Sequence, residues 1–260
     1  MSAHPGLTGP PTSAPAREAV LSLRGIAKSY GAARALAGVD LDVHPHEVVA
    51  VVGDNGAGKS TLVGVLTGAL APDRGEILLD RKPVSLTSPA AARALGIAAV
   101  FQDLALCENL DVVENLFLGH EALRGGLLDE VAMEKEAWEL LGQLAARVPS
   151  VRVPVAALSG GQRQAVAIAR SLLGQPRVVV LDEPTASLGL TQTAEFLTLV
   201  ERLRSRGHGV VLTSHSIVDV QAVADRIVVL RLGRVNGEFD AAKASYEELL
   251  AAVTGVGATR

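Results

Sequence analysis

A glycine-rich segment that follows an apolar run is the feature that most constrains the fold of this chain. Residues 53–61 read Gly-Asp-Asn-Gly-Ala-Gly-Lys-Ser-Thr, and the apolar run Val48–Val52 precedes them. This is the P-loop pattern, in which backbone N–H groups surround phosphate oxygens at the N-terminus of a helix. The segment predicts a buried strand, a phosphate-binding loop and a helix. The apolar positions expected on that helix are Leu62, Val65, Leu66 and Ala69.

The P-loop pattern predicts which residues contact a nucleoside triphosphate. Glycine adopts backbone conformations that are closed to other residues, so the N–H groups of this loop can turn inward. Lys59 is expected to reach the β- and γ-phosphates, and the Ser60 hydroxyl to bind Mg²⁺. A glycine turn that binds nothing is the alternative interpretation. The expected ATP-binding residues of the loop are Gly53, Asp54, Asn55, Gly56, Ala57, Gly58, Lys59, Ser60 and Thr61.

A second apolar run, Val178–Leu181, ends in two carboxylates, Asp182 and Glu183. A buried parallel strand would place them at the sheet edge where the P-loop also lies. Asp182 is expected to bind Mg²⁺ directly or through water. Glu183 is expected to face the γ-phosphate and polarise an attacking water. An adjacent Asp and Glu otherwise occur in solvated turns, which is the alternative interpretation.

The segment Leu158-Ser159-Gly160-Gly161-Gln162 precedes the second motif and predicts another helix start. Ser159 is a favourable N-cap residue, and a helix N-terminus with exposed glycine amides can bind phosphate. A capped helix with a flexible entry is the alternative interpretation. The apolar positions expected on this helix are Ala165, Ile168, Ala169 and Leu172.

Composition and charge exclude several classes of protein. The chain has 260 residues, 48% of them hydrophobic, which is sufficient for a large core. A net charge of −4 and only 3% aromatic residues argue against a nucleic-acid partner. The single cysteine, Cys107, excludes an internal disulfide, and no apolar run approaches the roughly 18–20 residues of a membrane span. There is no secretory pattern at the N-terminus, so we expect a soluble intracellular protein.

Short apolar runs that alternate with helical patterns predict an α/β fold with a mostly parallel sheet flanked by helices. Near the N-terminus, Leu21 and Leu23 alternate with polar residues, as do Leu41 and Val43, which predicts an antiparallel β region. The further strands are expected at Ile97–Val100, Val178–Leu181, Val210–Leu212 and Ile227–Leu230, and one of the helices at Ala194–Leu203.

We expect one domain over residues 18–255, with a Pro-rich disordered tail at 1–17 and a flexible end at 256–260. Its α/β core would comprise residues 18–103 and 177–255. Residues 104–176 have no clear strand run and predict a helical subdomain, with helical segments at Val113–Leu118 and Glu130–Leu144. We expect Trp138, in the second of these segments, to be a packing residue.

Taken in order, the P-loop, Gln102 after a strand, the Leu158–Gln162 segment, the Asp-Glu pair and His215 after a strand resemble the ATPase family of ABC transporters. The resemblance covers Val20 to about Gly237. It implies an ABC-type P-loop NTPase fold and a catalytic set of Glu183, His215, Lys59 and Gln102. It further implies that Tyr30 stacks on adenine and that Ser60, Gln102 and Asp182 form the Mg²⁺ site.

The family resemblance also implies partners. ATP and Mg²⁺ would close a head-to-tail homodimer in which residues 158–162 of one subunit cover the ATP of the other. The dimer would act on integral membrane permease subunits at the cytoplasmic face of the cell membrane. Gly189 stands where many family members have Asp, and with residues 101–119 and 223–234 it resembles the ATPases of ribose, xylose and fructose importers.

In importers of this kind a periplasmic or lipid-anchored sugar-binding protein would select the cargo. Three alternatives remain open from the sequence. They are an ABC transporter ATPase for another cargo, a soluble ABC-type ATPase of translation or DNA repair, and a P-loop kinase for a small metabolite.

Overall fold

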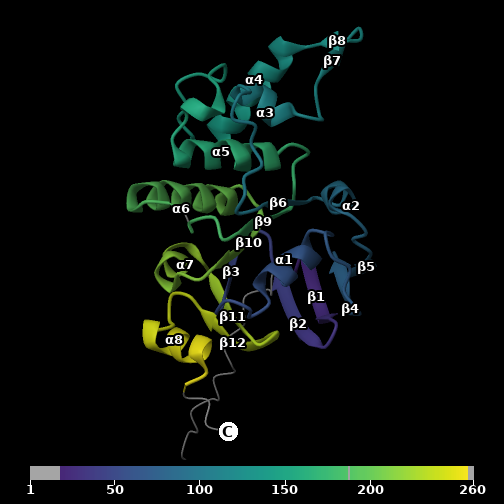
Figure 1. The fold of residues 1–260 in the computed structure, drawn as a ribbon, viewed down its shortest axis with the longest axis vertical. Helices are drawn as coiled ribbons and strands as arrows, with labels where there is room; N and C mark the ends of the chain where they lie inside the picture. Colours follow the sequence, from purple (N-terminus) through teal and green to yellow (C-terminus); the bar gives the residue numbers. More distant parts are fainter. Residues whose placement is uncertain (1–17, 187, 257–260) are drawn as a thin grey trace, which may run out of the picture.

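A computed structural model describes residues 18–186 and 188–256 (Figure 1). The expected disordered tail, residues 1–17, lies outside the described residues, and so do residues 257–260 of the expected flexible end. Within the described ranges, none of the helices combines the length and the apolar character that a bilayer span requires.

The centre of the molecule is a six-stranded, mostly parallel sheet. Each of its parallel strands is an apolar run, and the strands predicted from the sequence are confirmed. At one edge, β12 pairs antiparallel with β11, and the other pairings are parallel. In spatial order the strands are β12 (Arg234–Asp240), β11 (Arg226–Arg231), β3 (Val48–Val52), β10 (Gly209–Ser214), β9 (Val178–Asp182) and β6 (Ile97–Val100).

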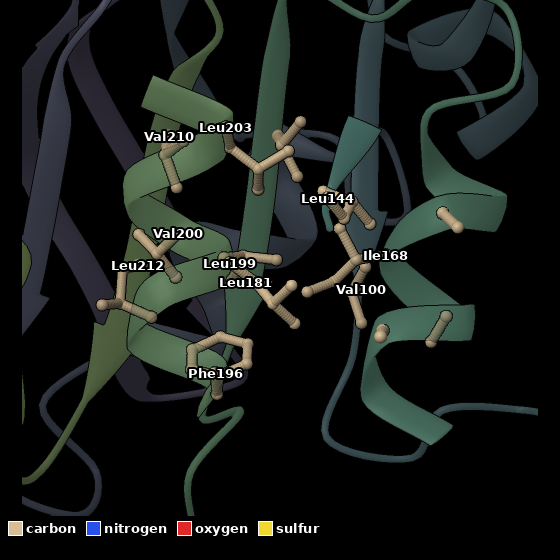
Figure 2. Packing of buried hydrophobic residues seen from close by; sticks show 14 of the residues in the cluster. Val100, Leu144, Ile168, Leu181, Phe196, Leu199, Val200, Leu203, Val210 and Leu212 are labelled. Atoms are coloured by element: carbon tan, nitrogen blue, oxygen red, sulfur yellow. The ribbon is translucent and has the colours of Figure 1, made fainter. Parts of the chain in front are cut away.

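Alternation along the strands divides the core into two layers. Val48, Ala50 and Val52 point into one layer and Val49 and Val51 into the other. The first layer lies between the sheet and the helices that cover one of its faces. Figure 2 shows side chains of α5 and α6 packed against those of the strands in this layer. Its helices include α5 (Gly160–Ser171), α6 (Leu190–Ser205), α7 (Ile217–Val223) and α8 (Tyr246–Thr254).

The opposite face of the central sheet packs against helices and a second, antiparallel sheet. The pairs Leu21–Val43 and Leu23–Leu41 lie directly opposite each other and are buried, which confirms the antiparallel region predicted from their alternation. The elements of this layer are α1 (Lys59–Leu66), α2 (Pro89–Ala94), β1 (Leu21–Tyr30), β2 (Ala33–Val43), β4 (Arg74–Leu79) and β5 (Lys82–Val84). The second face is therefore covered by strands as well as by helices.

The helical region lies at one end of the molecule and stacks on α6 through α5 (Figure 1). It contains α3 (Val112–Phe117), α4 (Glu130–Gln143) and a short 3-10 helix, η1 (Val155–Ala157). An unexpected hairpin, β7 (Leu123–Arg124) and β8 (Leu127–Leu128), lies between α3 and α4, with strands too short for alternation to be visible in the sequence. The predicted limits of this subdomain, residues 104–176, remain a prediction.

Two local expectations were wrong. Helix α1 ends at Leu66, so Ala69 lies beyond it and is exposed. The turn at Gly68 ends the helix, because its φ of 72° is left-handed and a Cβ there would lie 2.6 Å from the carbonyl oxygen of Ser88. Trp138 is not a packing residue, since 44% of its surface is exposed on α4.

Arg226 joins the two sheets through a half-buried ion network. Its Nε lies 2.8 Å from Glu47 Oε1, its Nη1 lies 2.6 Å from Glu238 Oε1, and its Nη2 donates to the carbonyl oxygen of Asp42. Burial raises the pKa of Glu47, but hydrogen bonds from Arg226 and His44 outweigh burial, so the net pKa is lower than usual. The folded state therefore favours the ionised Glu47 carboxylate.

We predict that Arg226→Met lowers the free energy of unfolding by about 3 kcal/mol at neutral pH, because it leaves the buried Glu47 carboxylate without its guanidinium partner. Arg204→Met is the matched control. Among the described residues Arg204 pairs with Asp225, and both side chains are partly open to solvent, so we expect a loss of less than about 1 kcal/mol. Urea denaturation of the three proteins measures both effects, and equal losses in the two variants would contradict the prediction.

The same network predicts a pH dependence. Because the folded state lowers the pKa of Glu47, its contribution to stability is present above the ordinary glutamate pKa of about 4.3 and is lost as the pH falls below it. The difference in unfolding free energy between the parent and Arg226→Met should therefore shrink below about pH 4. A difference that grows on acidification would show that Glu47 is not the group involved.

Candidate active site

The carboxyl ends of four neighbouring parallel strands meet at one edge of the central sheet. The P-loop follows β3, Gln102 lies just beyond β6, Asp182 ends β9, and His215 follows β10. A cleft of about 510 Å³ opens there. The predicted site residues that line it are Tyr30, Asp54, Asn55, Gly56, Gly58, Lys59, Ser60, Thr61, Gln102, Glu183 and His215.

The remaining predicted residues of this set lie beneath or beside the cleft. Ala57 is buried, with 5% of its surface exposed, and Asp182 is half-buried at the end of β9. Gly53 lies on an adjoining cavity that shares Asp54 and His215 with the cleft.

Two glycines of the P-loop are required by close packing. A Cβ on Gly53 would lie 2.2 Å from the carbonyl oxygen of Leu230, and a Cβ on Gly58 would lie 2.5 Å from that of Ala35. Gly58 is also left-handed, with a φ of 110°, where it caps α1. The loop is therefore held between β11 and β2 in a conformation that a larger residue would disrupt.

The start of α1 is suited to an anion. Lys59, Ser60 and Thr61 of its first turn line the cleft, so the positive end of the helix dipole faces it. No side chain caps this helix, and its first turn contains no acidic residue, which leaves its first N–H groups available. The Lys59 side chain is buried and adds a positive charge at the same place. Its Nζ donates to the carbonyl oxygen of Gly53 at 2.7 Å, which directs the ammonium back over the loop.

Glu183 lies between the two basic groups of the cleft. Its Oε1 is 3.3 Å from Lys59 Nζ, and its Oε2 is 2.8 Å from His215 Nδ1. The backbone of Glu183 is left-handed, with a φ of 46°, which is uncommon for a residue with a side chain. Its N–H donates to the carbonyl oxygen and the hydroxyl of Thr213 on β10, and these bonds hold the turn in place.

The residues predicted to bind Mg²⁺ present oxygen donors of different kinds. Ser60 and Gln102 line the cleft, and Asp182 accepts a hydrogen bond from the Thr213 hydroxyl at 2.7 Å. Within the described ranges there is no cluster of three or more His, Cys, Asp or Glu side chains that could hold a metal alone. Hydroxyl, amide and single carboxylate oxygens fit Mg²⁺, which usually keeps several waters and binds phosphates.

The segment 158–162 lies apart from the P-loop cleft. Ser159 caps α5, since its Oγ accepts from the N–H of Gln162 and its own N–H donates to Gln162 Oε1. Leu158 is buried, and Ser159, Gly161 and Gln162 line a second cavity of about 330 Å³. Gly160 packs against α6. The two predicted phosphate-binding motifs of one chain therefore form two separate places, with no lining residue in common.

Sequence reasoning missed Thr213 and Gln164. Thr213 contacts both acidic residues through its hydroxyl, and Gln164 on α5 donates to the carbonyl oxygen of Pro184, which follows Glu183. The available signal for Thr213 was a hydroxyl residue at the end of the apolar run Val210–Leu212. For Gln164 it was a polar residue on the buried side of a helix.

Comparisons with known proteins agree with this geometry. The family described as "ABC transporter" matches residues 36–186. The fructose import ATP-binding protein of Rhizobium meliloti is 44% identical over 84% of this chain and 87% of its own length. The xylose/arabinose import ATP-binding protein of Sulfolobus acidocaldarius is 40% identical over 90% of this chain and 94% of its own. A ribose import ATP-binding protein of Rubrobacter xylanophilus is 43% identical, and the match covers 47% of its length.

Solved structures show the same fold. An ATP-binding cassette of an ABC transporter in its ADP conformation has a TM-score of 0.78 and 28% identity, over 91% of this chain and 95% of its own. The protein cbiO1 of Clostridium perfringens, which is part of an ABC transporter complex, has a TM-score of 0.77 and 29% identity, over 92% of this chain and 96% of its own. The family match over residues 36–186 and relatives of at least 40% identity show that this chain belongs to the ABC transporter family, as one of its ATP-hydrolysing cassettes.

Proposed function

We propose that this chain is the ATP-driven motor subunit of an importer for a monosaccharide, at the cytoplasmic face of a membrane. The proposal of a monosaccharide as cargo rests on the sequence identity of 40–44% to proteins named for fructose, xylose/arabinose and ribose import. The cleft at the sheet edge supplies the ATPase chemistry. The fructose and xylose/arabinose relatives match this chain over 87% and 94% of their own length, and the ribose relative over 47% of its length.

ATP binding would use the P-loop and α1. The N–H groups of the loop and the uncapped start of α1 would surround the phosphates, and Lys59 would neutralise charge on the β- and γ-phosphates. Tyr30, half exposed at the end of β1, would stack on adenine at the other side of the cleft. Mg²⁺, held by Ser60, Gln102 and Asp182, would supply further charge neutralisation on the phosphates.

Hydrolysis would depend on Glu183 and His215. The Glu183 carboxylate would accept a hydrogen bond from water and orient its oxygen toward the γ-phosphorus. A bond forms between that oxygen and phosphorus, the bond to the bridging oxygen of ADP breaks, and the water proton passes to the phosphate or the carboxylate. His215, 2.8 Å from the carboxylate, would fix its orientation and contact the γ-phosphate. Lys59 would stabilise the developing charge.

A homodimer would bring the two separate motifs together. Because residues 158–162 lie away from the cleft of their own chain, they are available to a partner's nucleotide, and their helix N-terminus suits its γ-phosphate. Solved cassettes of similar fold include dimers, one of them bound to ADP and phosphate. ATP would close such a dimer head to tail, and hydrolysis would reopen it.

The helical region would contact the permease. Large apolar side chains on α3, α4 and the β7–β8 hairpin are exposed, which is typical of an interaction surface. They are Leu118, Leu123, Leu127, Leu128, Val131 and Trp138. A sugar-binding protein would join the assembly through the permease.

We predict that Glu183→Gln lowers kcat for ATP hydrolysis by about two to four orders of magnitude, because the amide cannot accept the water proton. ATP binding should persist, so the variant should accumulate as a closed dimer that size-exclusion chromatography detects in ATP and Mg²⁺. Glu139→Gln, the same change on an exposed part of α4, should behave as the parent. Normal turnover in Glu183→Gln would mean that another residue orients the water.

We predict that Lys59→Ala lowers kcat/KM for ATP by about two to three orders of magnitude, since it removes the positive charge at the phosphates. Lys135→Ala, at an exposed position of α4, is the control. Phosphate-release assays measure both variants. Near-normal activity of purified Lys59→Ala would rule out the P-loop cleft as the site.

Recovery of partners tests the transport role. Tagged Glu183→Gln with ATP and Mg²⁺ should recover a polytopic permease, and through it a sugar-binding protein, from detergent-solubilised membranes of the native host. Tagged Lys59→Ala, which we expect not to close, is the reference. Recovery of ribosomes or DNA-bound complexes in place of a permease would overturn the importer assignment and leave the ATPase chemistry intact.

A further inference from the structure

Helix α5 contacts the catalytic turn of its own chain through a buried glutamine. Gln164 lies on α5, in the turn after the segment 158–162, and only 5% of its surface is exposed. Its Nε2 donates to the carbonyl oxygen of Pro184. Because Pro184 directly follows Glu183, this bond joins the helix that begins with segment 158–162 to the residue predicted to orient water.

The oxygen of the same side-chain amide has no hydrogen-bond partner among the described residues. Gln164 Oε1 is buried and accepts no hydrogen bond from any described residue. A buried acceptor without a partner is uncommon in native proteins, and an apolar side chain of similar size would fill the same space without one. Packing alone therefore does not account for an amide here, whereas the bond to Pro184 requires its donor.

The catalytic turn is held from both sides. On one side, Thr213 of β10 accepts from the N–H of Glu183. On the other, Gln164 of α5 binds the carbonyl oxygen of Pro184. Since the backbone of Glu183 is left-handed, neighbouring contacts have to maintain that conformation. A movement of α5 would change one of these contacts, the hydrogen bond from Gln164 to Pro184.

The start of α5 also packs on the first turn of α6. A Cβ on Gly160 would lie 3.1 Å from Gln192 Nε2, and the Oε1 of Gln192 accepts from the N–H of Gly189 at 3.3 Å. Helices α5 and α6 lie against each other along this side (Figure 1). The start of α5 thus contacts Gln192, which binds the N–H of Gly189, the residue that precedes α6. This contact adds to the link of α5 to Pro184.

We propose that Gln164 is a positioning residue that couples the engagement of segment 158–162 to the orientation of Glu183 in the same chain. This rests on the proposed function, in which that segment contacts the nucleotide of the partner subunit. A shift of α5 on engagement moves the Pro184 carbonyl and with it the backbone of Glu183. The ATP bound to one subunit therefore acts on the catalytic turn of the other.

The link is tested first without turnover. Gln164→Met keeps the length of the side chain and removes the donor, and Gln143→Met makes the same change on α4 as a matched control. In the full-length chain without nucleotide, hydrogen exchange of peptides that cover Glu183–Ala186 should rise about tenfold in Gln164→Met only. Exchange equal to that of the parent would overturn the proposal, whatever the protein does with ATP.

Kinetics and stability then separate positioning from a structural role. We expect kcat of Gln164→Met to fall about tenfold and the positive cooperativity in ATP to be lost, with the affinity of the monomer for ATP unchanged. The variant removes one unpaired acceptor, Gln164 Oε1, but leaves the buried Pro184 carbonyl without its donor, so its Tm should stay close to that of the parent. A kcat that falls only in step with Tm would overturn the proposal.

Gln164→Leu provides a second variant if the methionine packs poorly, with the same expected outcomes.

Failure of the proposed function would give a different pattern of ATP hydrolysis. In that case the parent would not hydrolyse ATP, or Glu183→Gln would hydrolyse it normally, while the exchange result at Glu183–Ala186 would still decide whether the link exists.

Discussion

The parallel pairing of β9, β10 and β3 is the constraint on which the candidate site depends. Val52 lies opposite Ser214, and Thr213 lies opposite Asp182, so three strands end at the same level. Whatever follows these strands must meet at one edge of the sheet. The P-loop, the acidic pair and His215 lie up to 162 positions apart along the chain, from Gly53 to His215, yet this register makes them neighbours. A slip of one residue would turn the carboxylates to the wrong face.

The strands that could be predicted from the sequence are those in which burial produces a visible pattern of apolar residues. The central strands are buried on both faces and read as continuous apolar runs, and β1 and β2 are buried on one face and alternate. The β7–β8 hairpin was missed because two-residue strands have no period to detect. Thr213 and Gln164 were missed for another reason. Their roles depend on contacts with residues 31 and 20 positions away, Asp182 and Pro184, which no local pattern indicates.

The charges in the cleft are arranged so that a phosphate can replace Glu183 as the partner of Lys59. The buried Lys59 has a carboxylate neighbour, Glu183, at 3.3 Å, and its other close bonds are to backbone carbonyls. A γ-phosphate brings more negative charge to the same ammonium and competes with Glu183 for it. Glu183 keeps His215 as a partner on its other oxygen. Binding of the nucleotide can therefore free one carboxylate oxygen for water without leaving the side chain unsupported.

The position of Gly189 bears on how two such sites would communicate. The family resemblance implies an Asp there in many members, whereas in this chain the position is Gly, whose N–H is bound by Gln192, a residue of the following turn. Gly189 has no carboxylate to offer at the start of α6, and Gln192, which binds its N–H, lies against Gly160 of α5. In the coupling that we propose for Gln164, the signal would pass through packing and amide hydrogen bonds within a subunit. Such contacts weaken little with ionic strength, in contrast to a charge-mediated link across the dimer.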